Sequence, residues 1–276
     1  TPDPATSWKE RQRLFNLPRS SWLDYDAKLI SKGGGVFART EKSVKTTPEI
    51  RALLGITEKE LEPAALMTAI LKAPVQLMWF GGIGTYIKDR SESHLDVGDP
   101  GNDAIRVNGA DVRAQVIGEG ANLGITQAGR IGYALRGGRI NTDFIDNSAG
   151  VDCSDNEVNI KIALNAEMRA GRLKEPVRNT LLASMTDAVA RLVLDDNRLQ
   201  TLALSIAETG GPGDLPAYVR LIETFEGSGK LDRLVEGLAP NEELFRRASE
   251  GKGLTRPELA VLLSTAKLAA QDGVED

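Results

Sequence analysis

The chain has 276 residues, of which 41% are hydrophobic and 26% charged, and its formal net charge is −5 at pH 7. This length suits one large globular domain or two ordinary ones, each able to bury a core. The acidic balance and the lack of a basic block argue against a nucleic-acid surface or a polybasic membrane anchor. No apolar run reaches membrane-spanning length, and the single cysteine, Cys153, fits a reducing cytoplasm.

The first 47 residues are polar and irregular, and we expect only a short strand there, at residues 36–38. Because the sequence does not start with methionine, we expect Thr1 to be an internal boundary of a longer protein. Thr47 and Pro48 predict the cap and first turn of one helix, and Pro63 opens a second.

Three strands are predicted next, separated by helical or polar segments. VQLMWF, residues 75–80, is an almost continuous apolar run, which is typical of a strand buried on both faces of a parallel sheet. RAQVI, residues 113–117, and GRINTDFI, residues 138–145, are the other two, and Thr126 caps the helix between them. This alternation predicts a parallel sheet over residues 48–150.

The polar segment at residues 88–111 is expected to be a flexible acidic loop with a solvated histidine and no metal site. Residues after about 154 form successive periodic helices with no strand between them. Four single residues have simple structural interpretations. Trp79 and Phe80 are expected in the core, Cys153 as a small buried thiol and Arg106 at the surface.

Glycines crowd the segment GEGANLGIT, residues 118–126. Their spacing, Gly-x-Gly-x-x-x-Gly, misses the dinucleotide fingerprint by one position, and taken alone it favours a tight turn. A binder of a sugar phosphate or nucleotide phosphate at residues 118–124 is a further alternative, which predicts stabilisation by that ligand.

The position of this loop favours a binding role. Ligands of open parallel sheets bind outside the carboxyl ends of the strands. Three loops would share that edge here, at residues 81–86, 118–126 and 146–154. Two of them carry amide side chains, Asn122 and Asn147, which can donate and accept hydrogen bonds at once. We therefore predict a binding site where the three loops meet.

Several stretches, in this order along the chain, resemble glutamate dehydrogenases. GEGANLGITQAGR is similar to the Gly-Ala-Asn loop of that family, with Asn122 at the asparagine. TDFIDNSAGVDCSDNEV is similar to its Asp-x-x-x-Asn-x-x-Gly-Val-x-x-Ser stretch, with matching spacing at Asp143, Asn147 and Ser154. The chain resembles more specifically the very large bacterial NAD-specific glutamate dehydrogenases, and this resemblance extends from Ser7 to about residue 204. It is carried by SWKERQRLFNLPRSSWLDYD, WFGGIGTYIK, GDPGNDAIRVNGA and DNSAGVDCSDNEVNIKI.

The resemblance implies a fold. It is an α/β chain with an incomplete Rossmann-type parallel sheet followed by an all-helical C-terminal domain. Residues 1–152 would be the C-terminal part of a Rossmann-like NAD-binding domain, and residues 153–276 the helical domain.

The resemblance also implies roles for particular residues. Asn122 and Asn147 would face the nicotinamide end of NAD, and Ser154 would contact the side-chain carboxylate of glutamate. Ser154 is equally a good N-cap for a helix that starts after it. Three glycines would approach the cofactor through their backbone, namely Gly81, Gly82 and Gly120.

The sequence departs from the family by what it lacks. It contains neither the first strand with its Gly-x-Gly-x-x-Gly turn nor the lysines and aspartate of the substrate domain. The implied reaction is reversible oxidation of L-glutamate by NAD to 2-oxoglutarate and ammonia. We therefore expect a fragment without catalytic residues of its own, inactive and a poor NAD binder by itself. Its partners would be the remaining domains of the parent chain, in a cytoplasmic homo-oligomer. The alternative is a non-catalytic regulatory or assembly module of a large enzyme.

Overall fold

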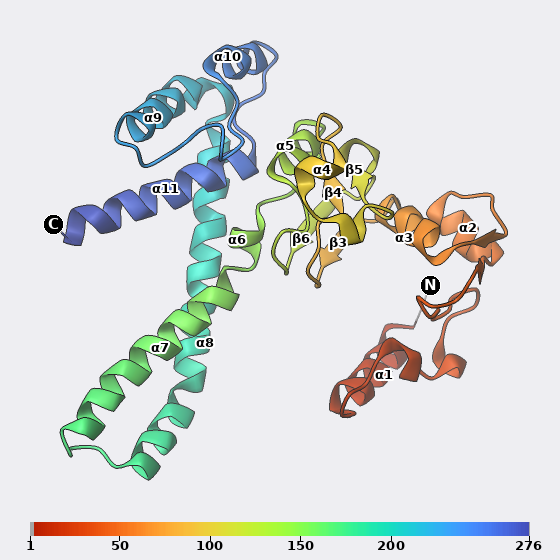
Figure 1. Ribbon diagram of the computed structural model, residues 1–276, viewed down its shortest axis with the longest axis horizontal. Coiled ribbons are helices and arrows are strands. Elements are labelled where there is room, and N and C mark those ends of the chain that lie inside the picture. The colour runs from red at the N-terminus through yellow and green to blue at the C-terminus, as the bar shows by residue number, and fades with distance from the viewer. Residues whose placement is uncertain (1–2, 276) are drawn as a thin grey trace.

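In the computed structural model, which describes residues 3–275, a pair of parallel strands forms the centre of the molecule (Figure 1). β3 (Leu77–Phe80) pairs with β6 (Val116–Glu119), with Leu77 opposite Val116 and Phe80 opposite Glu119. The parallel pairing of the two apolar segments is therefore confirmed. The second strand lies later than predicted, because residues 113–115 are outside it and Gly118 and Glu119, expected in the loop, are inside it. The chain is a mixed α/β protein in which helices predominate and the parallel sheets are small.

The third predicted strand, at residues 138–145, is wrong for most of its length. Only Arg139 forms a parallel bridge, to Val116, and helix α6 (Asp143–Asp146) then begins. The two isoleucines that suggested a strand belong to different cores. Ile140 packs with the central sheet and Ile145 with the C-terminal helices. The chain leaves the sheet between them.

The two faces of the β3–β6 pair differ. Phe80 and Ile117 are buried together with Tyr133 of α5 (Gln127–Leu135). On the other face Leu77 is 57% and Trp79 61% exposed, so the expectation that β3 is buried on both faces is wrong. Phe80 is in the core as predicted, but Trp79 is not. Asn197 and Arg256, from the C-terminal helices, border a small pocket on this face but leave Leu77 and Trp79 exposed.

The N-terminal region is more ordered than the sequence predicts. α1 (Pro4–Asn16) begins at Asp3, whose side chain accepts a hydrogen bond from the Thr6 backbone, and residues 36–38 form no strand. α2 (Pro48–Leu54) is capped by Thr47, and α3 (Pro63–Leu71) opens at Pro63, as predicted. The antiparallel strands β1 (Val44–Lys45) and β2 (Glu60–Leu61) share a small core with these two helices.

The acidic segment after β4 (Ile87–Lys88) folds around two buried cations instead of forming an open loop. It contains α4 (His94–Val97) and β5 (Val107–Asn108), which pairs with β4 in parallel. The Arg106 side chain is fully buried. It donates to the Thr85 carbonyl (2.8 Å) and pairs with Asp103, so its assignment to the surface is wrong. Lys88 Nζ donates to the Glu92 carbonyl (2.7 Å) and to the side chain of Asn108 (2.8 Å).

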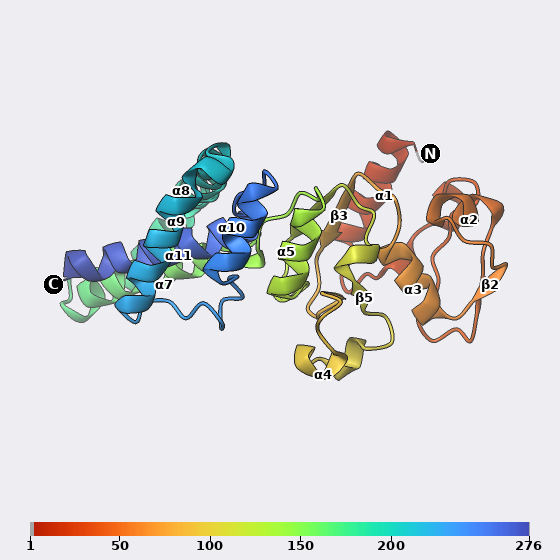
Figure 2. The same ribbon diagram turned by 90° about the horizontal axis from the view of Figure 1, so that it is seen from above.

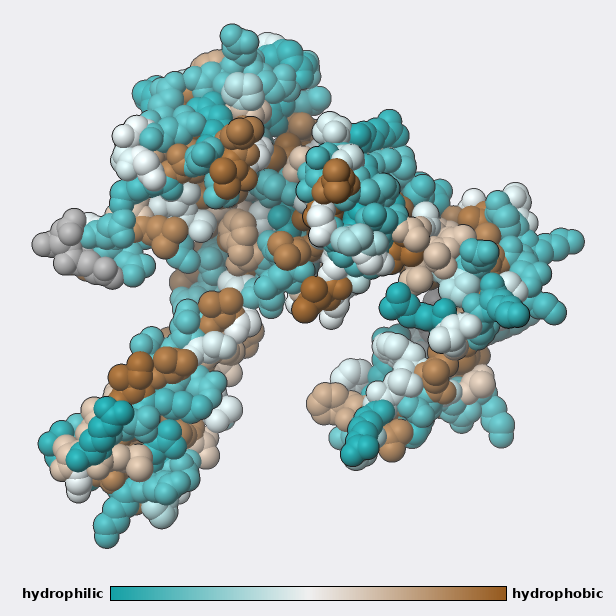
Figure 3. Space-filling view, in the orientation of Figure 1, coloured by the Kyte–Doolittle hydropathy of each residue, from teal (hydrophilic) through white to brown (hydrophobic). Residues whose placement is uncertain are grey.

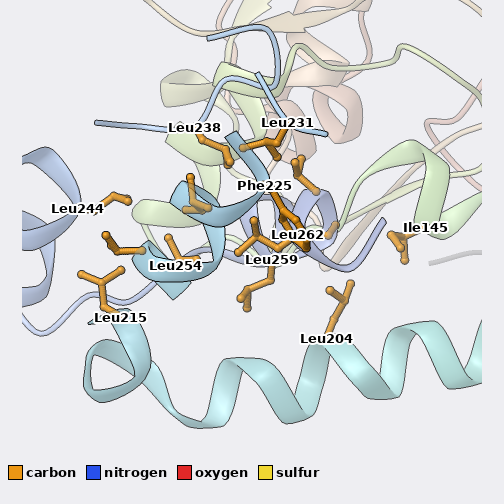
Figure 4. Close-up of a cluster of buried hydrophobic side chains, with 14 residues drawn as sticks. Ile145, Leu204, Leu215, Phe225, Leu231, Leu238, Leu244, Leu254, Leu259 and Leu262 are labelled. Atoms are coloured by element: carbon orange, nitrogen blue, oxygen red, sulfur yellow. The ribbon is translucent and has the colours of Figure 1, made fainter. Parts of the chain in front are cut away.

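The C-terminal half is helical, as the periodic pattern predicts. It consists of α7 (Ser148–Arg169), α8 (Glu175–Thr209), α9 (Leu215–Gly227), α10 (Asn241–Ser249) and α11 (Arg256–Glu275). A cluster of buried aliphatic side chains and one phenylalanine joins α8, α9, α10 and α11, and Ile145 of α6 reaches it (Figure 4). None of the helices in residues 3–275 is long and apolar enough to cross a lipid bilayer.

α7 and α8 form a long hairpin that projects away from the rest of the molecule (Figures 1 and 2). Apolar side chains lie exposed along it, including Ile162, Val177 and Leu192 (Figure 3). α7 also runs without interruption past residues 152 and 153, so one helix connects the α/β portion to the helical portion.

Candidate functional site

The two asparagines that the sequence singles out lie side by side. Asn147 Nδ2 donates a hydrogen bond to Asn122 Oδ1 at 3.0 Å. Asn122 lies in the loop after β6, and Asn147 lies at the junction of α6 and α7. Two residues 25 positions apart are thus brought to one edge of the sheet, at the carboxyl ends of its strands.

The loop after β3 is attached to the same edge. Thr85 Oγ1 donates to the Leu123 carbonyl at 2.8 Å, and the Tyr86 N–H donates to the Gly124 carbonyl at 2.9 Å. Gly81 and Gly82 precede these residues and are exposed. The predicted meeting of three loops at one edge is therefore what the hydrogen bonds show.

A cavity of about 1080 Å³ opens beside the amide pair. One wall is the loop and α6, through Asn122, Leu123, Asp143 and Asn147. The opposite wall consists of residues from α7, α8 and α11, including Lys267. Its volume is close to the upper limit of about 1,000 Å³ for small-molecule and cofactor sites. Its lining combines apolar side chains with amides, aspartates and one lysine.

Leu123 has an unusual backbone conformation for a leucine. Its φ is +62°, in the left-handed region that residues with a Cβ rarely adopt. Its side chain is 65% exposed, so packing does not impose this conformation. Hydrogen bonds do. The Leu123 N–H donates to Asp143 Oδ2 at 2.8 Å, and its carbonyl accepts from Thr85. Strained backbone of this kind is concentrated at ligand sites.

A buried group of charges lies directly beneath this loop. Arg130 of α5 donates to both oxygens of Glu119, at 2.7 and 2.8 Å, and lies 3.1 Å from Asp143 Oδ1. All three residues are buried. Burial raises the pKa of Glu119 to about 7, although the hydrogen bonds and positive charge of Arg130 oppose this shift. Asp146 accepts the Glu119 N–H at 2.9 Å, so α6 holds both the strand end and the loop.

The glycines of this loop have a packing role. Neither Gly118 nor Gly120 has a positive φ, so a left-handed turn is not the reason for them. A Cβ on Gly118 would lie 2.6 Å from Trp79 Cε3, and one on Gly120 would lie 2.7 Å from Trp79 Cε2. The indole ring therefore occupies the space above both residues. Figure 3 shows apolar surface at this end of the central strands.

Ser154 lies within α7, not before it. The helix begins at Ser148, so the interpretation of Ser154 as an N-cap is wrong, and its hydroxyl donates to the Gly150 carbonyl at 3.3 Å. It is exposed, two helical turns beyond Asn147, and is not among the residues that line the cavity. Cys153 is exposed as well, so its interpretation as a buried thiol is also wrong.

Three residues that the sequence analysis did not assign to the site support it, namely Glu119, Arg130 and Asp143. One signal in the sequence could have indicated a buried ion pair. Glu119 ends an apolar strand, and Arg130 lies in the helix that follows it. Asp143 was matched only by its spacing to Asn147. Its bond to Leu123 spans 20 residues and has no local signature.

Comparison with known proteins identifies the family of the chain. A family model described as "Bacterial NAD-glutamate dehydrogenase, catalytic domain" matches residues 1–207. The match covers most of the chain, and the chain therefore belongs to this family.

Curated relatives support the same assignment. The chain is 55% identical, over 273 residues, to the NAD-specific glutamate dehydrogenase of Pseudomonas aeruginosa. It is 51% identical over 267 residues to that of Halomonas elongata and 50% identical over 279 residues to that of Mycobacterium tuberculosis. These alignments cover 97–99% of this chain but only 17% of each relative, so the chain spans about a sixth of their length.

Proposed function

We propose that the chain is part of a longer NAD-dependent glutamate dehydrogenase, which converts L-glutamate, NAD and water to 2-oxoglutarate, ammonia and NADH. Membership of the family and the names of the relatives support this reaction. The observation that carries the proposal is the Asn122–Asn147 amide pair at the carboxyl edge of the parallel strands, beside a large cavity. In this proposal residues 1–152 complete a Rossmann-type NAD-binding domain whose other strands lie elsewhere in the parent protein. Residues 153–276 form the helical domain.

The residues present fit the nicotinamide end of NAD. A carboxamide offers one acceptor and two donors, and the side chains of Asn122 and Asn147 present the complementary groups. Gly81, Gly82 and Gly120 would border the cofactor through their backbone. Of these, Gly120 already has the Trp79 ring on one side, so only its other side is open to a ligand. When bound, NAD supplies a hydride acceptor.

The part played by this chain's own residues is binding and orientation. The two asparagines hold a planar amide in one orientation, and the Ser154 hydroxyl donates to the side-chain carboxylate of glutamate. Proton transfer and recognition of the rest of the substrate are assigned to the other domains of the parent. An isolated chain of this kind forms one wall of the site, so we expect it to be inactive and to bind NAD weakly.

A cytoplasmic location and a homo-oligomeric parent enzyme complete the proposal, with the lone Cys153 consistent with a reducing compartment. An assembly role is the second candidate. The exposed apolar side chains along the α7–α8 hairpin favour it, because such surface usually contacts another domain or subunit. The two roles are compatible, since only the base of the hairpin lines the cavity, and its exposed Ile162 and Val177 do not.

The test uses the full-length enzyme and four alanine variants. Asn122→Ala and Asn147→Ala should each raise the KM for NAD about tenfold, the effect expected for a lost hydrogen bond in a binding site. Ser154→Ala should raise the KM for glutamate by a similar factor. Ser184→Ala is the matched control, because Ser184 is also an exposed helical serine that donates to a backbone carbonyl of its own helix. Kinetics that are unchanged in the first three variants would refute the site and leave the assembly role.

A further inference from the structure

We propose that Asp143 is a positioning residue for the NAD site, which fixes the Asn122 amide by holding the Leu123 backbone in its left-handed conformation. The inference rests on the proposed function. It adds that the orientation of the amide pair depends on a buried carboxylate that itself need not touch the cofactor.

Both oxygens of this carboxylate are engaged. Asp143 Oδ2 accepts the Leu123 N–H at 2.8 Å, and Oδ1 lies 3.1 Å from an Arg130 nitrogen. The residue is only 8% exposed, so water does not replace either partner easily. A hydrogen bond from a backbone N–H to a buried carboxylate is short and strong, and it fixes the direction of that N–H.

Arg130 prevents the carboxylate from rotating away. Its guanidinium is planar and is fixed in turn by two hydrogen bonds to Glu119, at the end of β6. Strand β6, helix α5, helix α6 and the loop are therefore joined through one group of charges. The position of the loop is therefore fixed relative to strand β6, and not only by hydrogen bonds within the loop.

The loop needs such a restraint because its conformation is intrinsically unfavourable. A leucine at φ +62° relaxes toward negative φ unless neighbouring bonds prevent it. Asn122 immediately precedes Leu123, so relaxation at Leu123 swings the Asn122 side chain away from Asn147. The expected consequence is a disordered amide pair in an otherwise folded domain.

Rescue at Leu123 distinguishes this role from a general loss of stability. Glycine adopts positive φ at no steric cost, so Leu123→Gly removes the strain that Asp143 opposes. The substitution is tolerated locally, because the leucine side chain is exposed. If Asp143 acts through the backbone conformation, Leu123→Gly should restore cofactor binding in an Asp143→Ala background.

The experiment measures NADH affinity of the full-length enzyme by the fluorescence of the bound nicotinamide, together with the KM for NAD and for glutamate. Asp143→Ala should weaken NADH binding and raise the KM for NAD, each about tenfold, while the KM for glutamate changes less than about twofold. Leu123→Gly alone provides the baseline for the double variant, because Leu123 itself lines the cavity. In the double variant at least about threefold of the lost affinity should return.

Glu258→Gln provides the matched control. Arg247 and Glu258 form a second buried pair, also 11 residues apart, within the C-terminal helices and away from the loop. Its loss should lower thermal stability without weakening NADH binding. If Asp143→Ala does not fold, Asp143→Asn keeps the shape and one acceptor, and it should weaken binding in the same direction by about threefold.

Three results would overturn the inference. They are unchanged NADH affinity in both Asp143 variants, an equal loss in Glu258→Gln, and no recovery in the double variant. A wild-type enzyme that binds no NADH would refute the proposed function itself. A wild-type enzyme that binds NADH, with Asp143 variants that bind it equally well, would refute only the positioning role.

Discussion

Substitution of Gly120 by alanine should destabilise the fold by displacing Trp79 from the outer face of the central strands. The added Cβ would lie 2.7 Å from Trp79 Cε2, well inside van der Waals contact, so the indole must move. Because the ring is 61% exposed, it can swing into solvent instead of forcing the backbone apart. The cost is then the loss of its contact with the strand. The buried part of a tryptophan this exposed is on the order of 100 Å², which limits the cost to about 2 kcal/mol.

The assay is a double-mutant cycle by urea unfolding of the 276-residue chain, followed by far-ultraviolet circular dichroism so that the signal does not depend on tryptophan. Wild type, Gly120→Ala, Trp79→Ala and the double variant are compared. In wild type, Gly120→Ala should lower the free energy of unfolding by about 1–2 kcal/mol. In the Trp79→Ala background it should cost nothing or stabilise by a few tenths of a kcal/mol, because alanine restricts the unfolded chain.

Gly82→Ala is the control, since a Cβ there meets no atom within 4 Å. It should change the free energy of unfolding by less than about 0.5 kcal/mol. Equal costs of Gly120→Ala with and without the Trp79 ring would refute the reasoning. The glycine would then be required by the backbone itself, and the space above it would be irrelevant.

Two further predictions concern groups around the same loop. Because burial raises the folded-state pKa of Glu119 from 4.5 to about 7, the stability that it contributes is complete below pH 4.5 and is lost as the pH rises through 7. Glu119→Gln should therefore flatten the decline of the urea midpoint between about pH 5 and pH 8, and an unaltered decline would contradict the assignment. Thr126→Ala removes both the N-cap of α5 and a hydrogen bond to Glu92, at 3.0 and 2.6 Å. It should cost about 1–2 kcal/mol in the same assay, whereas a loss below about 0.3 kcal/mol would show that the cap contributes nothing.

Elements with local start signals were predictable from the sequence. Thr47, Pro63 and Thr126 act within one turn of the helices that they begin, so their effect does not depend on the tertiary fold. The parallel pairing of β3 and β6 was also predictable, because two apolar runs separated by helical and polar segments have few other arrangements.

Features that depend on distant partners were not predictable. The apolar run around Trp79 predicts a core residue. Its side chain is nevertheless exposed, because exposure depends on which other segments cover that face of the sheet. Ser154 has the composition of a helix cap, but α7 begins two turns earlier, where α6 turns away from the sheet. Arg106 resembles a surface arginine until its carbonyl partners from other segments are known.

The candidate site divides in the same way. Asn122 and Asn147 were predictable as neighbours, although on a premise that is half wrong. Each was expected to follow a strand of one parallel sheet, but Asn147 follows helix α6. The residues that hold this pair in place were not predictable. The bond from Asp143 to the Leu123 backbone requires a positive φ at a leucine, and sequence preference argues against that conformation.

The open side of β3 has a consequence for handling the chain by itself. Among the strands in residues 3–275, β3 hydrogen-bonds only to β6, so its outer edge presents unpaired backbone donors and acceptors. Exposed Leu77 and Trp79 lie beside that edge. Flat, apolar edges of this kind act as templates for strand addition between molecules. Two copies of the isolated chain can therefore pair through the outer edge of β3. The solubility of the isolated chain should increase when this edge is covered or carries charged side chains.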